Sequence, residues 1–545
     1  MKSLFYIILF LSITLLPTQP IQAQTVARKY LILLKDKTNS PYSVSKPQEF
    51  LSARAVARRV RQNIAITLRD LPVNPSYVSQ IKQTGAEIWF TSRWFNGVLV
   101  KATDAQLKTI NALSFVRGYE GKIALDAVDG VSSIERTNKF GVKGILDDPL
   151  SYGNSLNQNQ MIGADVMHQK GFHGEDMLIA VLDDGFLNSN TITPLKALFD
   201  EKRVVATYDF VAKESKVYED GGHGTQVLSC MAAQVPNSLY GTAYKATYAL
   251  LRTEDDDHES QIEEANWLIG AEYADSLGAD VINSSLGYTQ FDDPTTDHKY
   301  ADLNGNTTIA ARAANLAASV GIVCVLAAGN EGTAAWKYIG TPADADSAIA
   351  VGAVDANRLK ASFSSFGPSA DNQVKPDLCA KGLGSTVAST AGTVTTGNGT
   401  SFASPILCGM IAAFWQSRRY LTAIQVIDIM RKAGHLYATP NASLGYGVPT
   451  WQKAFDLAPA PLSVEELAEL GIKIYPNPLG NQDLQIEVIS EKIFEGQITN
   501  PLGQVIYTDI FSKGVKTVSF ASQPAGVYIL SVNDGNGAKA FKIVK

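Results

Sequence analysis

Five apolar runs between residues 178 and 354 constrain the fold more than any other feature of the sequence. None of them alternates apolar with polar residues, as a strand with one solvent-facing side does, so we expect strands that are buried on both faces. Helical segments separate the runs, and this order is typical of a parallel sheet with helices on both faces, an α/β fold. The runs are Leu178–Leu182, Thr247–Leu251, Val281–Ile282 with its flanks, Ile322–Ala328 and Ile349–Val354.

Single polar residues stand at the ends of these buried elements. Asp183 and Asp184 follow the first run, His223 precedes an apolar helix, and Asn330 follows the run that begins at Ile322. Each has a plainer interpretation as a turn or cap residue. Because sites in such sheets collect beyond the carboxyl ends of the strands, their joint occurrence favours a functional site there.

The stretch GTSFASP, residues 399–405, places Ser401 before a helix that is apolar on every side. A helix of that kind lies in a core, and Pro405 fits only its first turn. We therefore expect Ser401 at the N-terminus of the helix, on the rim of the core. A serine hydroxyl becomes an effective nucleophile when a histidine takes its proton and a carboxylate orients that histidine, and His223 and Asp183 are the candidates.

The order Asp, His, Ser and the motifs VLDDGF, GGHGTQV, INSSLG, AAGNEG and GTSFASP resemble those of the subtilisin-like serine proteases. The resemblance implies a catalytic domain over residues 160–457. In it, Asp183 orients His223, His223 acts as general base and then general acid, and Ser401 attacks the peptide carbonyl. The resemblance also implies that the side chain of Asn330 and the backbone N–H of Ser401 bind the oxyanion.

The same resemblance implies a set of substrate-binding residues. An edge segment pairs with the substrate as an added strand, and a second segment together with the loop Thr341–Ala343 walls the primary specificity pocket. These residues are Ser285, Leu286 and Gly287 for the edge, and Ala327, Ala328 and Gly329 for the pocket.

Three positions depart from the family pattern. Phe402 stands where Met is usual and Tyr244 where Pro is usual, and both are expected to tune packing. Asp184 replaces a Ser or Thr, so two neighbouring carboxylates compete for the role in the triad. The position two residues before Gly185 favours Asp183.

Residues 1–23 have the features of a secretory signal: Lys2, an apolar core over Leu4–Leu16 and a small residue, Ala23, at the expected cleavage site. The alternative, a membrane anchor, is disfavoured because the apolar run is short and is closed by Pro17 and Pro20. No later segment has the length of a membrane span, so we expect a soluble mature chain. A net charge of -6 gives no support for a nucleic-acid partner.

Residues 24–121 predict a small α+β unit without His or Cys. With the resemblance in place, this unit is similar to the propeptide that assists folding and blocks the cleft of these proteases. Such help is physically reasonable, since parallel sheets depend on distant pairings that form slowly. Residues 122–159 are expected to be a linker and lead-in, and the position of propeptide cleavage within them stays open.

After a linker over residues 458–470, short alternating strands over residues 471–545 predict a small β-sandwich. The stretch Tyr475–Pro478, the segment Gly526–Leu530, and Lys542 and Lys545 resemble the C-terminal sorting domain of the type IX secretion system. The alternative, a carbohydrate-binding module, is weakened by the lack of Trp in this unit.

Metal and redox chemistry find little support in the sequence. The four cysteines, Cys230, Cys324, Cys379 and Cys408, lie in or beside apolar runs without a C-x-x-C pair, which favours buried thiols over disulfides or zinc. Asp302, Asn304, Gly305 and Asn306 faintly resemble a calcium loop but are also ordinary turn residues. We therefore leave the metal open, including a structural calcium ion, and expect no cofactor for catalysis.

The predicted function is a secreted serine endopeptidase made as a zymogen and exported through the periplasm and outer membrane. Its expected partners are protein or peptide substrates, its own propeptide and the type IX secretion machinery. The acidic residues Glu254–Asp257 and Glu259 predict either a solvated loop or a rim that favours basic side chains in the substrate. Two alternatives stay open: a catalytically silent scaffold or surface-binding protein, and a transpeptidase or ligase that uses the same triad.

Overall fold

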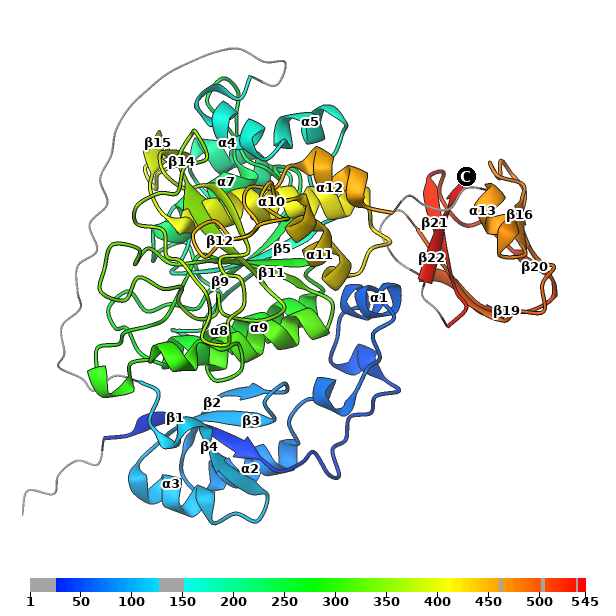
Figure 1. The fold of residues 1–545 in the computed structure, drawn as a ribbon. Helices are drawn as coiled ribbons and strands as arrows, with labels where there is room; N and C mark the ends of the chain where they lie inside the picture. Colours follow the sequence, from blue (N-terminus) through cyan, green and yellow to red (C-terminus); the bar gives the residue numbers. More distant parts are fainter. Residues whose placement is uncertain (1–25, 127–150, 460–463, 501–504, 536–537) are drawn as a thin grey trace, which may run out of the picture.

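The computed structural model describes residues 26–126, 151–459, 464–500, 505–535 and 538–545. The secretory signal expected over residues 1–23 and most of the expected linker, residues 127–150, lie outside these ranges. The described residues form an N-terminal α+β unit, a central α/β unit and a C-terminal β-sandwich (Figure 1). None of the helices in the described ranges combines the length and the apolar character needed to cross a membrane.

A seven-stranded sheet forms the centre of the α/β unit, in the order β13-β12-β11-β10-β5-β9-β6. All neighbouring pairs are parallel, so the predicted fold class is confirmed. The carboxyl ends of the strands therefore share one edge of the sheet. The strands are β5 (Leu178–Asp183), β6 (Val204–Asp209), β9 (Thr247–Arg252), β10 (Val281–Ser284), β11 (Val323–Ala327), β12 (Ile349–Val354) and β13 (Leu378–Lys381).

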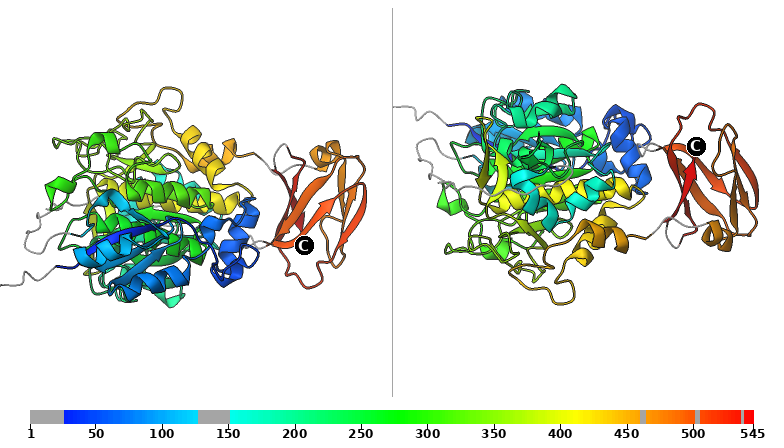
Figure 2. Two further views of the ribbon diagram at one scale, coloured as in Figure 1. Left: turned by 90° about the horizontal axis from the view of Figure 1, so that it is seen from below. Right: turned by 90° about the horizontal axis from the view of Figure 1, so that it is seen from above.

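Each face of this sheet is buried under a pair of long helices (Figures 1 and 2). Alternate residues of β5 show the division: Ile179 and Val181 join the core under α7 and α10, whereas Leu178 and Leu182 join the core under α8 and α9. Burial on both sides explains why the strands carry continuous apolar runs. The helices are α7 (His223–Ala232), α8 (Ile262–Leu277), α9 (Ile309–Ser319) and α10 (Thr400–Ser417).

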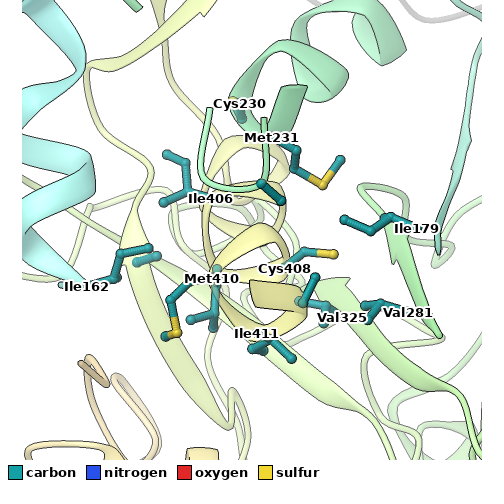
Figure 3. Packing of buried hydrophobic residues seen from close by; sticks show 14 of the residues in the cluster. Ile162, Ile179, Cys230, Met231, Val281, Val325, Ile406, Cys408, Met410 and Ile411 are labelled. Atoms are coloured by element: carbon teal, nitrogen blue, oxygen red, sulfur yellow. The ribbon is translucent and has the colours of Figure 1, made fainter. Parts of the chain in front are cut away.

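Helix α10 is buried from Thr400 to Trp415, as its apolar sequence predicts. Figure 3 shows Ile406, Cys408 and Met410 of this helix within the core. Pro405 corrects the prediction, because the helix begins at Thr400 and the proline therefore lies beyond the first turn. Proline cannot donate the hydrogen bond that the carbonyl four residues earlier would accept, so the carbonyl of Ser401 needs another donor.

The N-terminal unit is an antiparallel sheet in the order β2-β3-β1-β4. One face packs on its own helices α2 and α3, and the other packs on α8 and α9 through Leu31, Trp94 and Leu99. The elements are β1 (Arg28–Leu34), β2 (Glu87–Ser92), β3 (Gly97–Ala102), β4 (Val116–Tyr119), α1 (Ala53–Arg61), α2 (Pro75–Gln83) and α3 (Asp104–Asn111). Helix α1 begins at Ala53, because Ser52 caps it by accepting a hydrogen bond from the N–H of Ala55.

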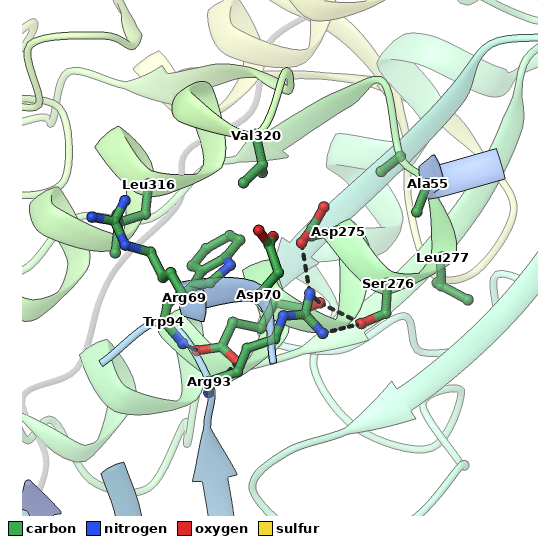
Figure 4. A network of polar contacts seen from close by, with 12 residues as sticks. Ala55, Arg69, Asp70, Arg93, Trp94, Asp275, Ser276, Leu277, Leu316 and Val320 are labelled. Atoms are coloured by element: carbon green, nitrogen blue, oxygen red, sulfur yellow. Dashed lines mark hydrogen bonds and ion pairs between the residues drawn. The ribbon is translucent and has the colours of Figure 1, made fainter. Parts of the chain in front are cut away.

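A buried polar network joins this unit to α8 (Figure 4). The carboxylate of Asp275 accepts hydrogen bonds from the guanidinium groups of Arg58, Arg59 and Arg93. Burial alone would raise the pKa of Asp275, but these three cations hold it well below its usual range. One turn earlier, Glu272 accepts hydrogen bonds from Ser92 and from the backbone of Arg93.

The C-terminal unit consists of two antiparallel sheets, β16-β17-β20 and β19-β18-β21-β22, packed around one apolar core. The helix α13 (Val464–Glu469) places Leu467 in that core, which extends the unit upstream of the boundary expected at residue 471. The strands are β16 (Ile472–Tyr475), β17 (Leu484–Val488), β18 (Phe494–Thr499), β19 (Val505–Phe511), β20 (Gly514–Val518), β21 (Val527–Asn533) and β22 (Ala538–Val544).

All four cysteines are buried and unpaired, as their apolar surroundings predict. Burial raises the pKa of each thiol, so none is poised to form a thiolate.

Candidate active site

Asp183 and His223 meet at the carboxyl edge of the central sheet. Asp183 is the last residue of β5, and His223 is the first residue of α7. The ring Nδ1 of His223 lies 2.6 Å from Oδ1 of Asp183, whose side chain is fully buried. An ionised carboxylate can only accept, so this contact places a proton on Nδ1 and assigns Nε2 to any proton exchange with a third group.

Glycines allow the segment after β5 and the segment at the start of α7 to pass each other in direct backbone contact. A Cβ on Gly185 would lie 2.1 Å from the carbonyl oxygen of Asp220, and one on Gly224 would lie 2.2 Å from the carbonyl oxygen of Gly185. Gly221, with a φ of 59°, provides the left-handed turn that brings the chain back toward His223. Gly185, Gly221 and Gly224 of the DDG and GGHG motifs are thus required by the backbone.

Asp184 has a different position from Asp183. Its carboxylate accepts hydrogen bonds from the backbone N–H of His223, at 3.1 Å, and of Gly224, at 2.9 Å. These are free N–H groups at the start of α7, so Asp184 acts as its cap. Burial and the neighbouring charge of Asp183 raise the pKa of Asp184 to about 7. Of the two competing carboxylates, the structure places Asp183 against the imidazole and Asp184 against the helix.

Ser401 lies in the first turn of α10, with 8% of its surface exposed. Its hydroxyl donates to the carbonyl oxygen of Ser285 at 3.3 Å, and the hydroxyl of Ser285 donates to the carbonyl oxygen of Ser401 at 2.8 Å. The second bond supplies the donor that Pro405 cannot provide. Ser285, predicted only as a substrate-binding residue, therefore also holds the serine in place.

Asn330 follows β11 and faces the start of α10. Its Oδ1 accepts hydrogen bonds from the backbone N–H of Thr400, at 2.9 Å, and from the hydroxyl of Thr400, at 3.1 Å. These two donors fix the orientation of the amide, so its two N–H donors lie at the end of the side chain that does not contact Thr400. Nδ2 lies 3.7 Å from the position that a Cβ on Gly399 would occupy.

Thr400 is a functional residue that sequence reasoning missed. Its hydroxyl donates to Asn330 and accepts a hydrogen bond from the N–H of Gly329 at 3.1 Å, so one side chain links β11 to α10. The only signal in the sequence is its position next to Ser401.

The expected substrate-binding residues lie on two adjacent segments. Tyr288, directly after the edge Ser285–Gly287, exchanges backbone hydrogen bonds with Thr341 at 2.8 and 3.3 Å. Gly340 donates to the carbonyl oxygen of Ala328 at 3.2 Å, which joins the same loop to the expected pocket wall. Gly329 adopts a φ of 107° beside Ser365. The structure therefore brings Ser285–Gly287, Ala327–Gly329 and the loop around Thr341 together.

The two other departures from the family pattern are packing residues. The ring of Phe402 lies 5.9 Å from that of His223, centroid to centroid. Tyr244 belongs to a separate aromatic cluster in which its ring lies 5.0 Å from those of His168 and His173. Burial lowers the pKa of His168 to about 4, so the His168 ring is neutral near pH 7.

The acidic stretch after β9 is divided between the interior and the surface. Glu254 is buried and accepts a hydrogen bond from the hydroxyl of Tyr288 at 2.7 Å, and burial raises the pKa of Glu254 to about 8. It therefore does not belong to an exposed rim, which corrects the prediction for this residue. Asp256 and Asp257 are exposed, and the charge of Asp256 interacts with those of Asp183 and His223.

Metal binding has two candidate positions among the described residues. Ligand atoms of Asp183, Asp184 and His223 lie within 4.8 Å of one another. A cation on Nδ1 would displace the hydrogen bond to Asp183, so the geometry fits proton transfer better than metal binding. In the predicted calcium loop, Asn304 Oδ1 accepts from the N–H of Asn306 and from Thr307, which is turn chemistry.

A parallel α/β sheet that presents a carboxylate, an imidazole and a helix-borne serine at one edge defines a serine hydrolase. The subtilase family matches residues 174–447, half of the chain. The chain belongs to this family, and it is a subtilisin-like serine endopeptidase.

The similarity to individual proteins agrees with the family assignment. Subtilisin DY from Bacillus licheniformis is 33% identical over 49% of this chain and 86% of its own length. Subtilisin NAT from Bacillus subtilis subsp. natto is 34% identical over 49% of this chain and 62% of its own length. The solved structure of fervidolysin from Fervidobacterium pennivorans, a keratinolytic enzyme related to subtilisin, shares the fold with a TM-score of 0.54 at 18% identity, over 94% of this chain and 71% of its own.

The flanking units also match known families. The peptidase S8 propeptide domain of Bacteroidota matches residues 29–139, and a secretion system C-terminal sorting domain matches residues 473–545. The chain is therefore a protease with a propeptide and a type IX sorting domain that directs it to secretion or to the cell surface.

Proposed function

We propose that Asp183, His223 and Ser401 hydrolyse peptide bonds through an acyl-enzyme intermediate. Nε2 of His223 removes the proton of the Ser401 hydroxyl as the oxygen attacks the substrate carbonyl, and the resulting imidazolium returns that proton to the leaving amine. Asp183 keeps the ring in the required tautomer and stabilises its positive charge. The observation that carries this proposal is the 2.6 Å contact between Nδ1 and Asp183, since it fixes which ring nitrogen exchanges the proton.

The hydroxyl of Ser401 has one proton, which it donates to the carbonyl of Ser285. Transfer to His223 therefore requires that the hydroxyl turn from this carbonyl toward the ring. The same turn releases the oxygen for attack, so we expect substrate binding along Ser285–Gly287 to favour it.

Asn330 and the backbone N–H of Ser401 stabilise the oxyanion of the tetrahedral intermediate in this scheme. The supporting feature is the fixed amide of Asn330, whose acceptor end is held by Thr400. A donor held in place before the reaction needs no reorganisation when charge develops. Water then attacks the acyl group and restores the serine, which distinguishes a hydrolase from a transpeptidase or ligase.

A serine-directed phosphonate tests the catalytic assignment. The processed wild-type protein should become labelled on Ser401, the Ser401→Ala variant should not, and the Ser404→Ala variant is the matched control. Ser404 lies one turn along α10 and bonds to Asn283, so its loss should leave labelling intact. Processed protein that takes up no label would support the scaffold instead, and peptide products formed only with an added amine would support a transpeptidase.

The propeptide is proposed to act in cis as an inhibitor and folding aid before it is cut within residues 122–159. Support comes from the sheet β2-β3-β1-β4, which packs its apolar face against α8 and α9. Proteins or peptides are the proposed substrates, and the type IX machinery is the proposed partner of the sorting domain.

Asp256 and Asp257 are proposed to favour basic side chains in the substrate, because both are exposed and the charge of Asp256 reaches the triad. Cleavage of a peptide library by the Asp256→Asn, Asp257→Asn double variant should show a reduced preference for Lys and Arg. An exposed acid outside this stretch, Asp428, which pairs with Lys432, provides the control through Asp428→Asn. An unchanged preference for Lys and Arg would contradict the proposal and would favour the interpretation of this stretch as a solvated loop.

A further inference from the structure

A cavity of about 170 Å³ lies between helix α1 of the propeptide domain and the catalytic domain. This volume corresponds to about five water molecules, enough for a small ion with part of its hydration shell. Charged side chains dominate its lining: Arg54, Arg58, Arg61, Asp176, Asp280 and Arg419.

Asp280 is the shared partner of three arginines in this cavity. Its Oδ1 lies 3.2 Å from Nη2 of Arg61 and 3.0 Å from Nη1 of Arg419, and its Oδ2 accepts from Arg54. Oδ2 also accepts the backbone N–H of Leu178 at 3.1 Å. One carboxylate therefore accepts hydrogen bonds from three arginines and from one backbone N–H group.

The other charged side chains of the cavity lining leave an excess of positive charge. Arg58 is compensated outside the cavity by Asp275, which leaves Arg54, Arg61 and Arg419 against Asp176 and Asp280. Arg61 is only 6% exposed, and its Nε has no hydrogen-bond partner among the described residues; the Nε of Arg419 is in the same situation. Burial, and next the charge of Arg419, lower the pKa of Arg61 to about 9.

Arg61 and Arg419 both line the cavity, and each has a buried Nε without a hydrogen-bond partner among the described residues, which is rare for buried N–H groups. We propose that this cavity binds one tetrahedral oxyanion, sulfate or inorganic phosphate. Such an ion accepts hydrogen bonds from guanidinium forks with two oxygens at once, and it supplies the negative charge that the lining lacks.

The oxyanion bridges two parts of the molecule that separate on activation. Arg54 and Arg61 belong to the propeptide domain, whereas Arg419 and Asp280 belong to the catalytic domain. Removal of the propeptide dismantles the site, so the ion binds the docked state alone and stabilises it by mass action. The ion would thus slow release of the propeptide. Binding of the ion does not depend on the proposed catalytic residues, whereas its effect on release rests on the proposed function of the propeptide.

Isothermal titration of sodium sulfate into the full chain tests the proposal. The chain carries Ser401→Ala so that the propeptide stays attached, and sodium chloride keeps the ionic strength constant. We expect one site per chain, and a loss of affinity of about tenfold or more for Arg61→Gln. Arg69→Gln removes the same charge from an exposed position of the same domain and should bind as the parent does.

A second variant covers the case in which Arg61→Gln fails to fold. Arg419→Gln changes the catalytic side of the cavity and should lose affinity similarly, with the fold checked by circular dichroism. The proposal is overturned when the parent chain shows no saturable sulfate binding above the chloride background. It is also overturned when Arg61→Gln or Arg419→Gln binds sulfate as tightly as Arg69→Gln.

Discussion

Asn330 illustrates how one side chain can be assigned by its partners. Thr400 donates both hydrogen bonds that the amide oxygen accepts, so the NH2 end is the part that would contact the oxyanion in the proposed mechanism. A donor that acts on the oxyanion should contribute to the transition state and little to substrate binding.

The Asn330→Ala variant should therefore lower kcat and leave KM nearly unchanged. The expected loss in kcat is about 10²- to 10³-fold, the effect already known when the corresponding type of donor is removed from subtilisin. Steady-state kinetics on a peptide substrate measure both constants. An increase in KM with an unaltered kcat would assign Asn330 to substrate binding instead.

Asp184 allows a prediction about pH. Burial and Asp183 raise its pKa from an ordinary value near 4 to about 7 in the folded protein. Between these values the folded state holds a proton that the unfolded chain has released, so this group makes the free energy of unfolding fall as the pH rises. Asp184→Asn removes this titration, and the stability of the variant should improve relative to the wild type from about pH 4 to about pH 7.

Denaturant unfolding at several pH values, in the Ser401→Ala background, measures this difference. The amide loses one acceptor for the N–H groups of α7, but that cost does not depend on pH and leaves the slope unaffected. Parallel stability curves for the two proteins would show that Asp184 is ionised throughout.

At the scale of single elements, helix α10 carries the proposed nucleophile Ser401 and also packs in the core. Gly409 lies where the helix meets the segment before β9, and a Cβ there would lie 2.0 Å from Oγ1 of Thr242 and 3.0 Å from the N–H of Ala243. Both partners are buried, so neither can move aside easily.

Gly409→Ala should destabilise the protein by about 1–3 kcal/mol through overpacking. Helix propensity alone predicts the opposite, a gain of about 1 kcal/mol from alanine in a helix interior. The sign of the change in a urea unfolding experiment therefore decides between crowding and propensity.

The sequence predicts the elements better than their polar contacts. Continuous apolar runs such as Leu178–Leu182 identify buried parallel strands because burial on both faces leaves no other pattern. Ser401 lies in the first turn of α10 as predicted, but Pro405 lies beyond that turn, where Ser285 satisfies the carbonyl of Ser401 in place of the proline. That bond joins residues 116 positions apart, and no local pattern contains it.

For the candidate site, too, the sequence predicts which residues take part better than it predicts their polar contacts. Asp183, His223, Asn330 and Ser401 stand out as polar residues at the ends of apolar elements. The roles of Thr400 and Asp184 depend on which N–H groups fold back toward them, and Glu254 is acidic in sequence but interior in structure. Such contacts are set by the tertiary fold.

For the molecule as a whole, Asp275 is the principal polar contact between propeptide and catalytic domain. The side chains of Asp275 and Arg58 are fully buried, and the partners Arg59 and Arg93 are nearly so. Removing one partner from a buried ion pair leaves uncompensated charge and typically costs about 3–5 kcal/mol.

Asp275→Asn should therefore weaken the docking of the propeptide by about 3 kcal/mol or more. The Ser401→Ala chain with and without this change can be compared by thermal unfolding. Lys432 and Asp428 form an exposed pair on α11 (Ala423–Ala433), and Asp428→Asn should have an effect below about 1 kcal/mol. Equal shifts for the two variants would contradict a dominant role for Asp275.

The depressed pKa of Asp275 also determines the pH range over which this residue stabilises the docked propeptide. Its stabilising contribution is present above the ordinary carboxyl value and is lost only as the pH falls through the much lower value in the folded protein. Mild acid therefore should not loosen this contact.

The burial of the four thiols has a consequence for the export of the protein. An oxidising compartment can act only on sulfur that it reaches, and in the folded protein each of the four sulfurs is buried. The folded protein therefore holds together without cross-links between its cysteines, through close packing and buried polar contacts.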